Sequence, residues 1–186
     1  MLFIHIISTE DTNDFATIYA GFENDENTTI LINPTRAECK KAIINEKERI
    51  VFIGHGTEGG LLNQRLDGFM VGSDMVQFLR GKDIIGIWCY AGNFAQRYDL
   101  TGFFTSMFIS NRQELVENIT SCDSSEEDII RENELFSTRI NELLRAQTPT
   151  SEWQQILQSY ITPTTPRFVQ YNYEAMCSLT ENDYEL

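Results

Sequence analysis

Two blocks of the sequence, Ile50-Val51-Phe52-Ile53-Gly54-His55-Gly56 and Ile84-Ile85-Gly86-Ile87-Trp88-Cys89, decide how the chain folds. Each block begins with apolar, largely β-branched residues, a pattern typical of a strand that is buried on both faces. Each block also ends at a residue that can do chemistry. Such strands belong to parallel sheets covered by helices, and ligands of these sheets bind at the carboxyl ends of the strands. We therefore expect His55 and Cys89 to project from the same edge of one sheet.

Strand and helix patterns alternate on either side of these blocks. We expect further strands at residues 2–7, 29–32 and 103–109, helices at 12–22 (after a cap cluster at 11–13), 36–47 and 91–98, a hairpin pairing 61–62 with 69–71, and a short helix after 72–74. This alternation predicts an α/β fold with a mostly parallel central sheet between two helical layers, an α/β/α sandwich. We find no sign of a domain boundary, and expect one domain over residues 1–186.

The sequence changes character after residue 110, where we expect a helical elaboration of the domain. Ser124-x-x-Glu127 resembles a capping box and predicts the start of a long helix, and a second helix is expected at about residues 151–161. The alternation from Phe168 to Tyr173 predicts a strand at the edge of the sheet. The last residues, 179–186, are polar and acidic, and we expect a loose tail.

The formal net charge of −14 restricts the class of partner. Nucleic acids and anionic membrane surfaces attract clustered Lys and Arg, so neither is expected as a partner. The four cysteines form no C-x-x-C pair, which argues against a zinc site and a disulfide framework. No run approaches the ~20 apolar residues of a membrane span. We expect a soluble, cytoplasmic protein without metal or cofactor, whose partner is a peptide or protein substrate.

His55 and Cys89 together predict nucleophilic chemistry. A thiol attacks as its thiolate, and a neighbouring imidazole either stabilises that form or takes the proton during attack. Gly56 lets the backbone approach a ligand closely, so its N–H and that of Cys89 are candidate donors to an oxyanion. A thiol activated in this way is expected to react with iodoacetamide faster than the other three cysteines.

An apolar block that ends in His-Gly, followed by one that ends in Cys, resembles the caspase-like (clan CD) cysteine peptidases, which include caspases, metacaspases, legumains, gingipains and clostripain. The C-x-x-G spacing of Cys89 and Gly92 is similar to that of legumains and metacaspases. The resemblance covers roughly residues 1–115. It implies a caspase-like sandwich and an endopeptidase that works through an acyl-enzyme. His55 would be the general base and acid, Cys89 the nucleophile, and the Gly56 and Cys89 N–H groups the oxyanion hole.

The resemblance has departures that concern substrate binding. Members of the group usually carry a small or acidic residue directly before the cysteine, where this chain has Trp88. The acidic composition favours a basic P1 side chain, while Arg112 favours the opposite choice. We take Trp88, Glu58, Asp67, Asp99 and Arg112 as the candidate substrate-binding residues. The sequence leaves the P1 preference and the oligomeric state open.

Two other functions compete with the peptidase. A catalytically inactive caspase-like binding or regulatory module is favoured by Trp88 and by the lack of a specificity acid. A flavodoxin-like or nucleotide-binding domain would use Gly54-His55-Gly56-Thr57 as a phosphate cradle. The glycines continue into a predicted hairpin, where a dinucleotide-binding loop requires a helix. An α/β-hydrolase is disfavoured because no G-x-S-x-G is present.

Overall fold

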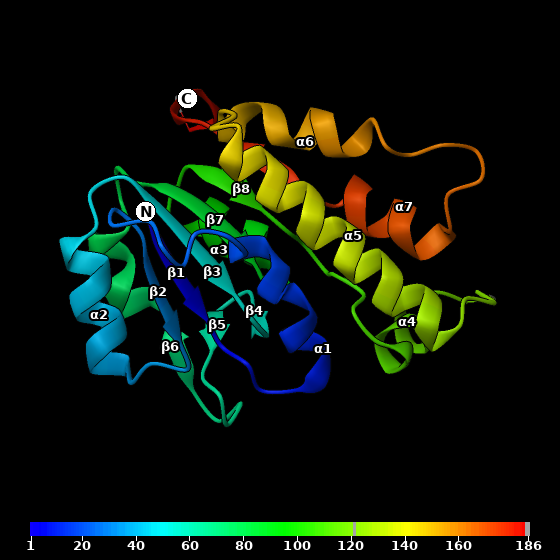
Figure 1. Ribbon diagram of the computed structural model, residues 1–186, viewed down its shortest axis with the longest axis horizontal. Coiled ribbons are helices and arrows are strands. Elements are labelled where there is room, and N and C mark those ends of the chain that lie inside the picture. The colour runs from blue at the N-terminus through cyan, green and yellow to red at the C-terminus, as the bar shows by residue number, and fades with distance from the viewer. Residues whose placement is uncertain (121, 185–186) are drawn as a thin grey trace.

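The computed structural model describes residues 1–120 and 122–184 and is an α/β fold built on a six-stranded sheet (Figure 1). The strands are β1 (Leu2–His5), β2 (Thr29–Ile32), β3 (Arg49–Ile53), β7 (Asp83–Ile87), β8 (Gly102–Phe104) and β9 (Cys177–Leu179). They lie in the order β2-β1-β3-β7-β8-β9. All neighbouring pairs are parallel except β8 with β9. The predicted mostly parallel sheet is thus confirmed.

The helices connect and cover these strands. They are α1 (Glu10–Asn13), α2 (Arg36–Asn45), α3 (Ala91–Arg97), α4 (Arg112–Asn118), α5 (Glu126–Arg145), α6 (Thr150–Gln158) and α7 (Arg167–Glu174), with 3₁₀ turns η1 (Asp14–Tyr19), η2 (Ser73–Phe78) and η3 (Glu181–Asp183). A small antiparallel sheet, β4 (Gly56–Thr57), β5 (Gly60–Leu62) and β6 (Phe69–Val71), follows β3 directly. It contains the predicted hairpin.

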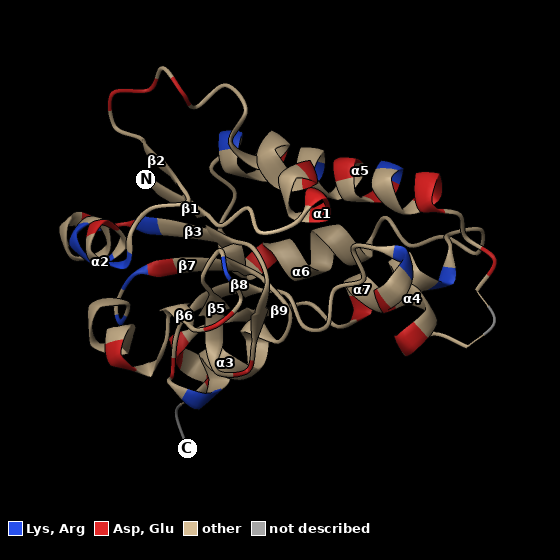
Figure 2. Cartoon of the chain, turned by 90° about the horizontal axis from the view of Figure 1, so that it is seen from below, with Lys and Arg blue, Asp and Glu red and all other residues tan. Residues whose placement is uncertain are grey.

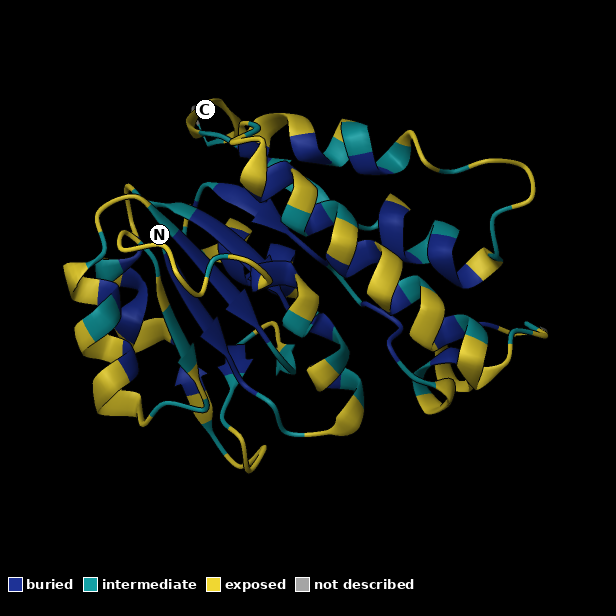
Figure 3. Cartoon of the chain, viewed as in Figure 1, coloured by how far each residue is buried: buried dark blue, intermediate teal, exposed yellow. Residues whose placement is uncertain are grey.

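Alternate residues of the central strands belong to two separate cores, one on each face of the sheet. Phe3, Val51 and Ile85 pack with the apolar residues of η1, α5, α6 and α7. Ile4, Phe52 and the other even-numbered residues of these strands pack with α2, η2, α3 and the small sheet. The central strands are accordingly buried along their length (Figure 3), and α5 and α3 lie on opposite sides of the sheet (Figure 2). Burial on both faces explains the near-continuous apolar runs in the sequence.

The prediction of an edge strand from Phe168 to Tyr173 is wrong, because this segment forms helix α7. Its buried residues, Phe168, Val169, Asn172 and Tyr173, follow the helical spacing of one face. Pro166 stands immediately before the helix, a position that needs no backbone N–H. The edge strand is instead β9, which pairs with the far side of β8. Burial against the α5 and α6 core therefore overrides the local alternation.

Other boundaries also differ from the prediction. The helix predicted at 12–22 is a single turn of α-helix followed by the 3₁₀ turn η1, with Thr9 as its N-cap. The long helix α5 is capped one residue later than predicted, by Ser125 with Asp128 as its box partner. The strand predicted at 103–109 ends at Phe104. The predicted loose tail is held to the domain up to Tyr184, whose hydroxyl donates to Leu100 O at 2.9 Å. Residues 185 and 186 lie outside the described part.

Gly102 is expected to be the most restrictive glycine of the central sheet. It starts β8 with a φ of +134°, and a Cβ built there would lie 1.9 Å from the carbonyl oxygen of Ile84 in the paired strand β7. Gly102→Ala must therefore separate two backbones, and we expect a loss of about 2–4 kcal/mol in the free energy of unfolding, measured by urea denaturation.

Gly81→Ala is the matched control for this change. Its φ is +75°, but an added Cβ would have no atom within 4 Å. It is therefore expected to lose only the cost of a left-handed alanine, about 1–2 kcal/mol. Equal losses in the two variants would contradict the close β7–β8 pairing.

No helix within the described residues has both the length and the apolar character required to cross a bilayer.

Candidate functional site

The candidate site lies where the strand order reverses direction. From β1 the chain passes to β2 on one side, then returns to β3 on the other side of β1 and continues to β7 in that direction, so the loops that follow β1 and β3 diverge at the carboxyl edge of the sheet. In open parallel sheets this switch point is where ligands bind. His55 follows β3 and Cys89 follows β7, and Ile53 pairs with Ile87 in the two strands. Both residues line one small cavity, of about 20 Å³.

The turn that carries His55 depends on the glycine before it. Gly54 has a φ of +150°, and a Cβ at this position would come within 2.9 Å of the Ile6 carbonyl oxygen. Its N–H donates to Ile87 O at 3.1 Å, which ties the turn to the end of β7. The chain then enters the small sheet at Gly56. The His55 side chain that this turn presents is partly buried.

The turn that carries Cys89 is strained. Tyr90, directly after it, adopts a left-handed conformation with a φ of +67°. This conformation is costly for a residue other than glycine and is found preferentially at functional turns. Thr105 pins the turn by donating to Trp88 O at 2.8 Å, and the Tyr90 N–H donates to Ser106 O. The Cys89 N–H itself has no acceptor among the described residues, so it is free to bind an oxyanion.

Two residues from the loop after β1 hold the imidazole of His55. Its Nε2 lies 2.7 Å from Thr9 Oγ1 and 3.6 Å from Asp11 Oδ1. A carboxylate only accepts, so a proton on Nε2 serves both oxygens and leaves the lone pair on Nδ1. The interaction with Asp11 raises the pKa of His55 above its usual value, against the effect of burial. Asp11 thus both orients the ring and makes it a stronger base.

A third acidic residue, Glu114, completes the surroundings of His55. Ser110 Oγ lies 2.8 Å from Asp11 Oδ2 and 3.0 Å from Glu114 Oε2. Asn111 Nδ2 donates to the same oxygen of Asp11 at 3.0 Å. Burial favours the neutral form of Asp11, but hydrogen bonds from His55, Thr9, Asn111 and Ser110 outweigh it and hold the pKa of this carboxyl well below its usual range. Burial raises the pKa of Glu114.

The helices after residue 110 buttress this part of the site. Asn133 of α5 donates to Ser110 O at 2.8 Å. Asn172 of α7 accepts from Ile109 N at 2.8 Å and donates to Ile109 O at 3.1 Å. Both amides are buried. The helical elaboration therefore fixes the segment that carries Ser110 and Glu114, which links α5 and α7 to the site.

The thiol of Cys89 is enclosed in its protonated form. It donates to Phe108 O at 3.6 Å. Burial, together with the negative charges of Glu114 and Asp11, raises its pKa to about 12. No hydrogen bond joins Cys89 to His55 in the described part of the chain. In this closed arrangement we expect Cys89 to react slowly with iodoacetamide, in contrast to the expectation from the sequence, and the labelling experiment decides between the two.

Trp88 is a core residue, although it also borders the cavity. Its indole packs edge-on against Phe52 and Phe94, and its Nε1 donates to Thr57 O at 3.3 Å. A Cβ at Gly56 would lie 2.0 Å from the indole. The glycine after His55 is thus required by the tryptophan before Cys89, a coupling that unites the two sequence blocks.

The other predicted substrate-binding residues do not converge on the cavity. Glu58 pairs with Arg97 at 3.4 Å on the surface, and Asp67 accepts from Asn63 at the tip of the β5–β6 connection. Asp99 lies between α3 and β8, at the opposite, amino end of the strands. The Arg112 guanidinium donates to Ser124 O. None of the four lines the cavity that contains Cys89.

The second histidine, His5, has a structural role. It is fully buried in β1, with Nε2 donating to Thr12 O at 2.7 Å and Nδ1 accepting from the Tyr19 hydroxyl at 3.1 Å. Burial lowers its pKa to about 4, so it remains neutral near neutral pH. His5 thereby anchors the α1–η1 segment, which carries Asp11.

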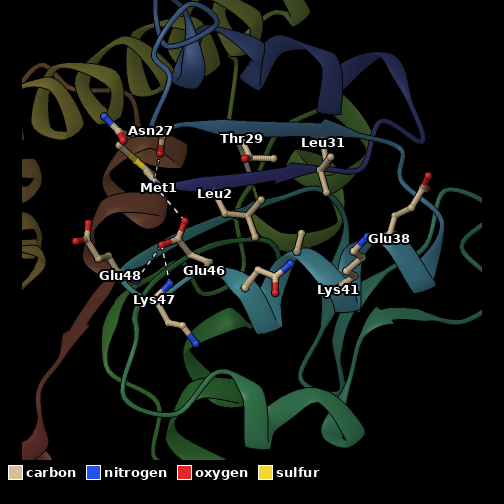
Figure 4. Close-up of a pocket in the computed structure, with 12 residues that line it drawn as sticks. Met1, Leu2, Asn27, Thr29, Leu31, Glu38, Lys41, Glu46, Lys47 and Glu48 are labelled. Atoms are coloured by element: carbon tan, nitrogen blue, oxygen red, sulfur yellow. Dashed lines mark hydrogen bonds and ion pairs between the residues drawn. The ribbon is translucent and has the colours of Figure 1, made fainter.

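A larger hollow lies away from this chemistry. A cavity of about 630 Å³ opens beside α2, β2 and the amino end of β1 (Figure 4). Lysines and carboxylates both line its wall, among them Lys41, Glu46 and Lys47. It has neither histidine nor cysteine in its lining. This cavity is much larger than the one at the carboxyl edge, but the residues that can catalyse a reaction gather at the carboxyl edge.

Comparisons of the chain with protein-family models, with curated proteins and with solved structures found no match.

Proposed function

We propose that the chain is a cysteine endopeptidase of the caspase-like type, with Cys89 as nucleophile and His55 as general base. The observation that carries the proposal is the shared cavity at the switch point of the sheet, which both residues line. Asp11 behind the imidazole supplies the third group that catalytic histidines commonly use for orientation. The strained Tyr90 turn and the free Cys89 N–H support the same reading.

The reaction would proceed through a thioester. As Cys89 Sγ attacks the carbonyl carbon of a peptide, its proton passes to His55 Nδ1. The oxyanion that forms is bound by the Cys89 N–H, with Gly56 as the second candidate donor. His55 then gives the proton to the leaving amine, and the C–N bond breaks. Water, activated by His55, hydrolyses the thioester and restores the thiol.

Substrate binding requires the site to open. A cavity of about 20 Å³ has no space for a peptide, and the thiol is held by Phe108 O. The segment between β8 and α4, which carries Phe108, must therefore move for the carbonyl carbon to reach Sγ. Its release would also expose the thiol to solvent and so lower its pKa from about 12. The structure accordingly corresponds to a resting form of the proposed enzyme.

A catalytically inactive binding or regulatory module of the same fold is the second candidate. The enclosed, protonated thiol of Cys89 favours it. A nucleotide-binding function has less support, because the glycines after β3 lead into strands β4 and β5 and not into a helix. The carboxylates of Asp11 and Glu114 beside His55 would also repel phosphate.

Fluorogenic peptides that vary at P1 test the proposal. We expect turnover with at least one P1 residue, and a basic residue is the first choice because Asp11 and Glu114 make the edge of the site acidic. Assays before and after limited proteolysis would show whether the closed form needs activation. Lack of cleavage with every P1 residue under both conditions would favour the binding module.

A further inference from the structure

Three side chains at the site have the geometry of an incomplete metal centre. Ligand atoms of Asp11, His55 and Glu114 all lie within 4.8 Å of one another. The three residues come from separate parts of the chain: Asp11 from α1 after β1, His55 from the turn after β3, and Glu114 from α4 after β8. All three are partly buried. Two carboxylates and an imidazole are a ligand set that Zn²⁺ accepts, with water in the fourth position.

The hydrogen bonds of this cluster conflict when both of its carboxyl groups are ionised. Ser110 Oγ has one hydrogen but faces both Asp11 Oδ2 and Glu114 Oε2. With both groups as carboxylates, one of these two contacts lacks a proton. In the described part of the chain no Lys or Arg side chain pairs with either carboxylate. A cation between the carboxylates would remove this conflict.

One carboxylate oxygen of Asp11 and one of Glu114 are already fixed by hydrogen bonds, an arrangement that suits a metal site. Asp11 Oδ2 is held by Ser110 and Asn111, and every hydrogen bond to the Glu114 carboxylate from the described residues uses Oε2. Asp11 Oδ1, which faces His55, and Glu114 Oε1 are therefore the oxygens that a metal ion beside His55 would reach. Hydrogen bonds to the non-ligating atoms of this kind orient metal ligands in proteins.

We propose that Asp11, His55 and Glu114 bind a divalent transition-metal ion such as Zn²⁺, and that the ion inhibits the dyad. The inhibitory part rests on the proposed peptidase function. Zn²⁺ bonds of about 2.0–2.2 Å place tetrahedral ligands about 3.3–3.6 Å apart, so the three side chains need to close by about 1 Å. His55 would exchange its Thr9 contact for the metal.

The inhibition follows from the two nitrogens of the imidazole. His55 faces Asp11 through Nε2, and a metal there takes the Nε2 lone pair. The one proton of the neutral ring must then sit on Nδ1. Nδ1 is consequently a donor and can no longer accept the proton of Cys89. Metal binding and catalysis are therefore mutually exclusive at this histidine.

Isothermal titration of the chelator-treated full chain with Zn²⁺ tests the site. We expect one ion per chain with a Kd below about 100 µM. Glu114→Gln and Asp11→Asn should each weaken binding by about 10–100-fold. Glu117→Gln, an exposed change one turn along α4, is the matched control and should leave the Kd unchanged. Circular dichroism verifies that each variant is folded.

The binding test does not depend on activity. Cys89→Ser should keep the Zn²⁺ affinity, because the thiol is outside the ligand set. Binding without peptide cleavage would leave the metal site standing and remove the peptidase. Cleavage that Zn²⁺ inhibits and chelator restores would support both. Absence of binding, or binding equally weakened by Glu117→Gln, would overturn the metal site whatever the activity.

Discussion

Cys89→Ser is expected to lower peptide cleavage by at least ~10⁴-fold while the fold is retained. Serine is nearly isosteric with cysteine, and its hydroxyl can donate to Phe108 O as the thiol does. The reactivity changes much more than the shape, because a hydroxyl is a far weaker acid than a thiol and His55 cannot activate it to the same degree. The measurement is kcat/KM on the best P1 peptide, with thermal unfolding followed in parallel.

Cys122→Ser is the control for this experiment. Cys122 is partly buried, its Sγ lies 3.4 Å from Ser124 Oγ, and it does not line the cavity of the candidate site. Its replacement should leave kcat/KM within about twofold of the parent, because surface substitutions away from special features have small effects. Activity that survives in Cys89→Ser, or that disappears in Cys122→Ser, would show that Cys89 is not the nucleophile.

Alkylation gives an independent view of the same thiol. In the closed arrangement the Cys89 thiol has a pKa of about 12 and Cys177 one of about 11, so both should label slowly near neutral pH. A peptide inhibitor that opens the segment around Phe108 would break the Sγ contact. Fast labelling of Cys89 without such an inhibitor would contradict the closed arrangement.

The strands at the centre of the sheet could be predicted because burial on both faces leaves a local signature. The range predicted for β2 matches the structure to the residue, β3 ends at Ile53 where its apolar run ends, and β7 ends at Ile87, one residue before the end of its run at Trp88. Their register then brings His55 and Cys89 to one edge, as parallel strand ends require. The main elements of the dyad hypothesis were thus accessible from two short blocks.

The two acidic residues of the site, Asp11 and Glu114, could not be predicted in the same way. Asp11 and Glu114 are about a hundred residues apart and belong to no motif, and Asp11 was interpreted as part of a helix cap. They meet because β1 and β8 flank β3 and β7 in the sheet, an order that local patterns do not encode. A weak signal exists, since both residues lie in the first turn of a helix that follows a strand of the sheet. The sequence predicts no metal site for the same reason. That prediction relies on ligands that lie close together in the chain, and Asp11, His55 and Glu114 do not.

The wrong prediction of a strand in place of helix α7 has a different cause. From Phe168 to Tyr173 every residue is aromatic, β-branched or a small amide, and alternation and helical spacing fit equally well over so short a length. The choice depends on α5, whose Phe136 contacts Tyr173 at 6.2 Å between ring centroids. Tertiary packing decides here, and Asn172 then reaches Ile109 only because the segment is helical.

Asp11→Asn is expected to shift the pH profile of the proposed peptidase toward acid and to lower its maximum rate. Between the pKa of His55 and about 12, the dyad consists of thiol and neutral imidazole, and kcat/KM rises as His55 loses its proton. Asp11 raises the pKa of His55, so the acid limb of the parent lies above pH 6.5. Without that charge the limb moves to lower pH.

The rate effect has a separate cause. Asparagine in place of Asp11 no longer stabilises the imidazolium that forms as Cys89 attacks, and its amide can turn an N–H toward Nε2 and disturb the tautomer. We expect kcat to fall by about 10–10³-fold with little change in KM, since Asp11 acts through His55 and is a positioning residue. The other titratable groups around His55 are Glu114 and the thiol of Cys89, and both are kept in this variant.

Glu10→Gln is the matched control, since Glu10 precedes Asp11 in α1 and is exposed. The profiles should be recorded with chelator present, so that loss of a metal ligand cannot imitate loss of the base. A shift of the acid limb in Asp11→Asn but not in Glu10→Gln would support the assignment of Asp11 to His55. An unchanged limb with only a lower rate would mean that Asp11 stabilises the loop after β1 without tuning the histidine.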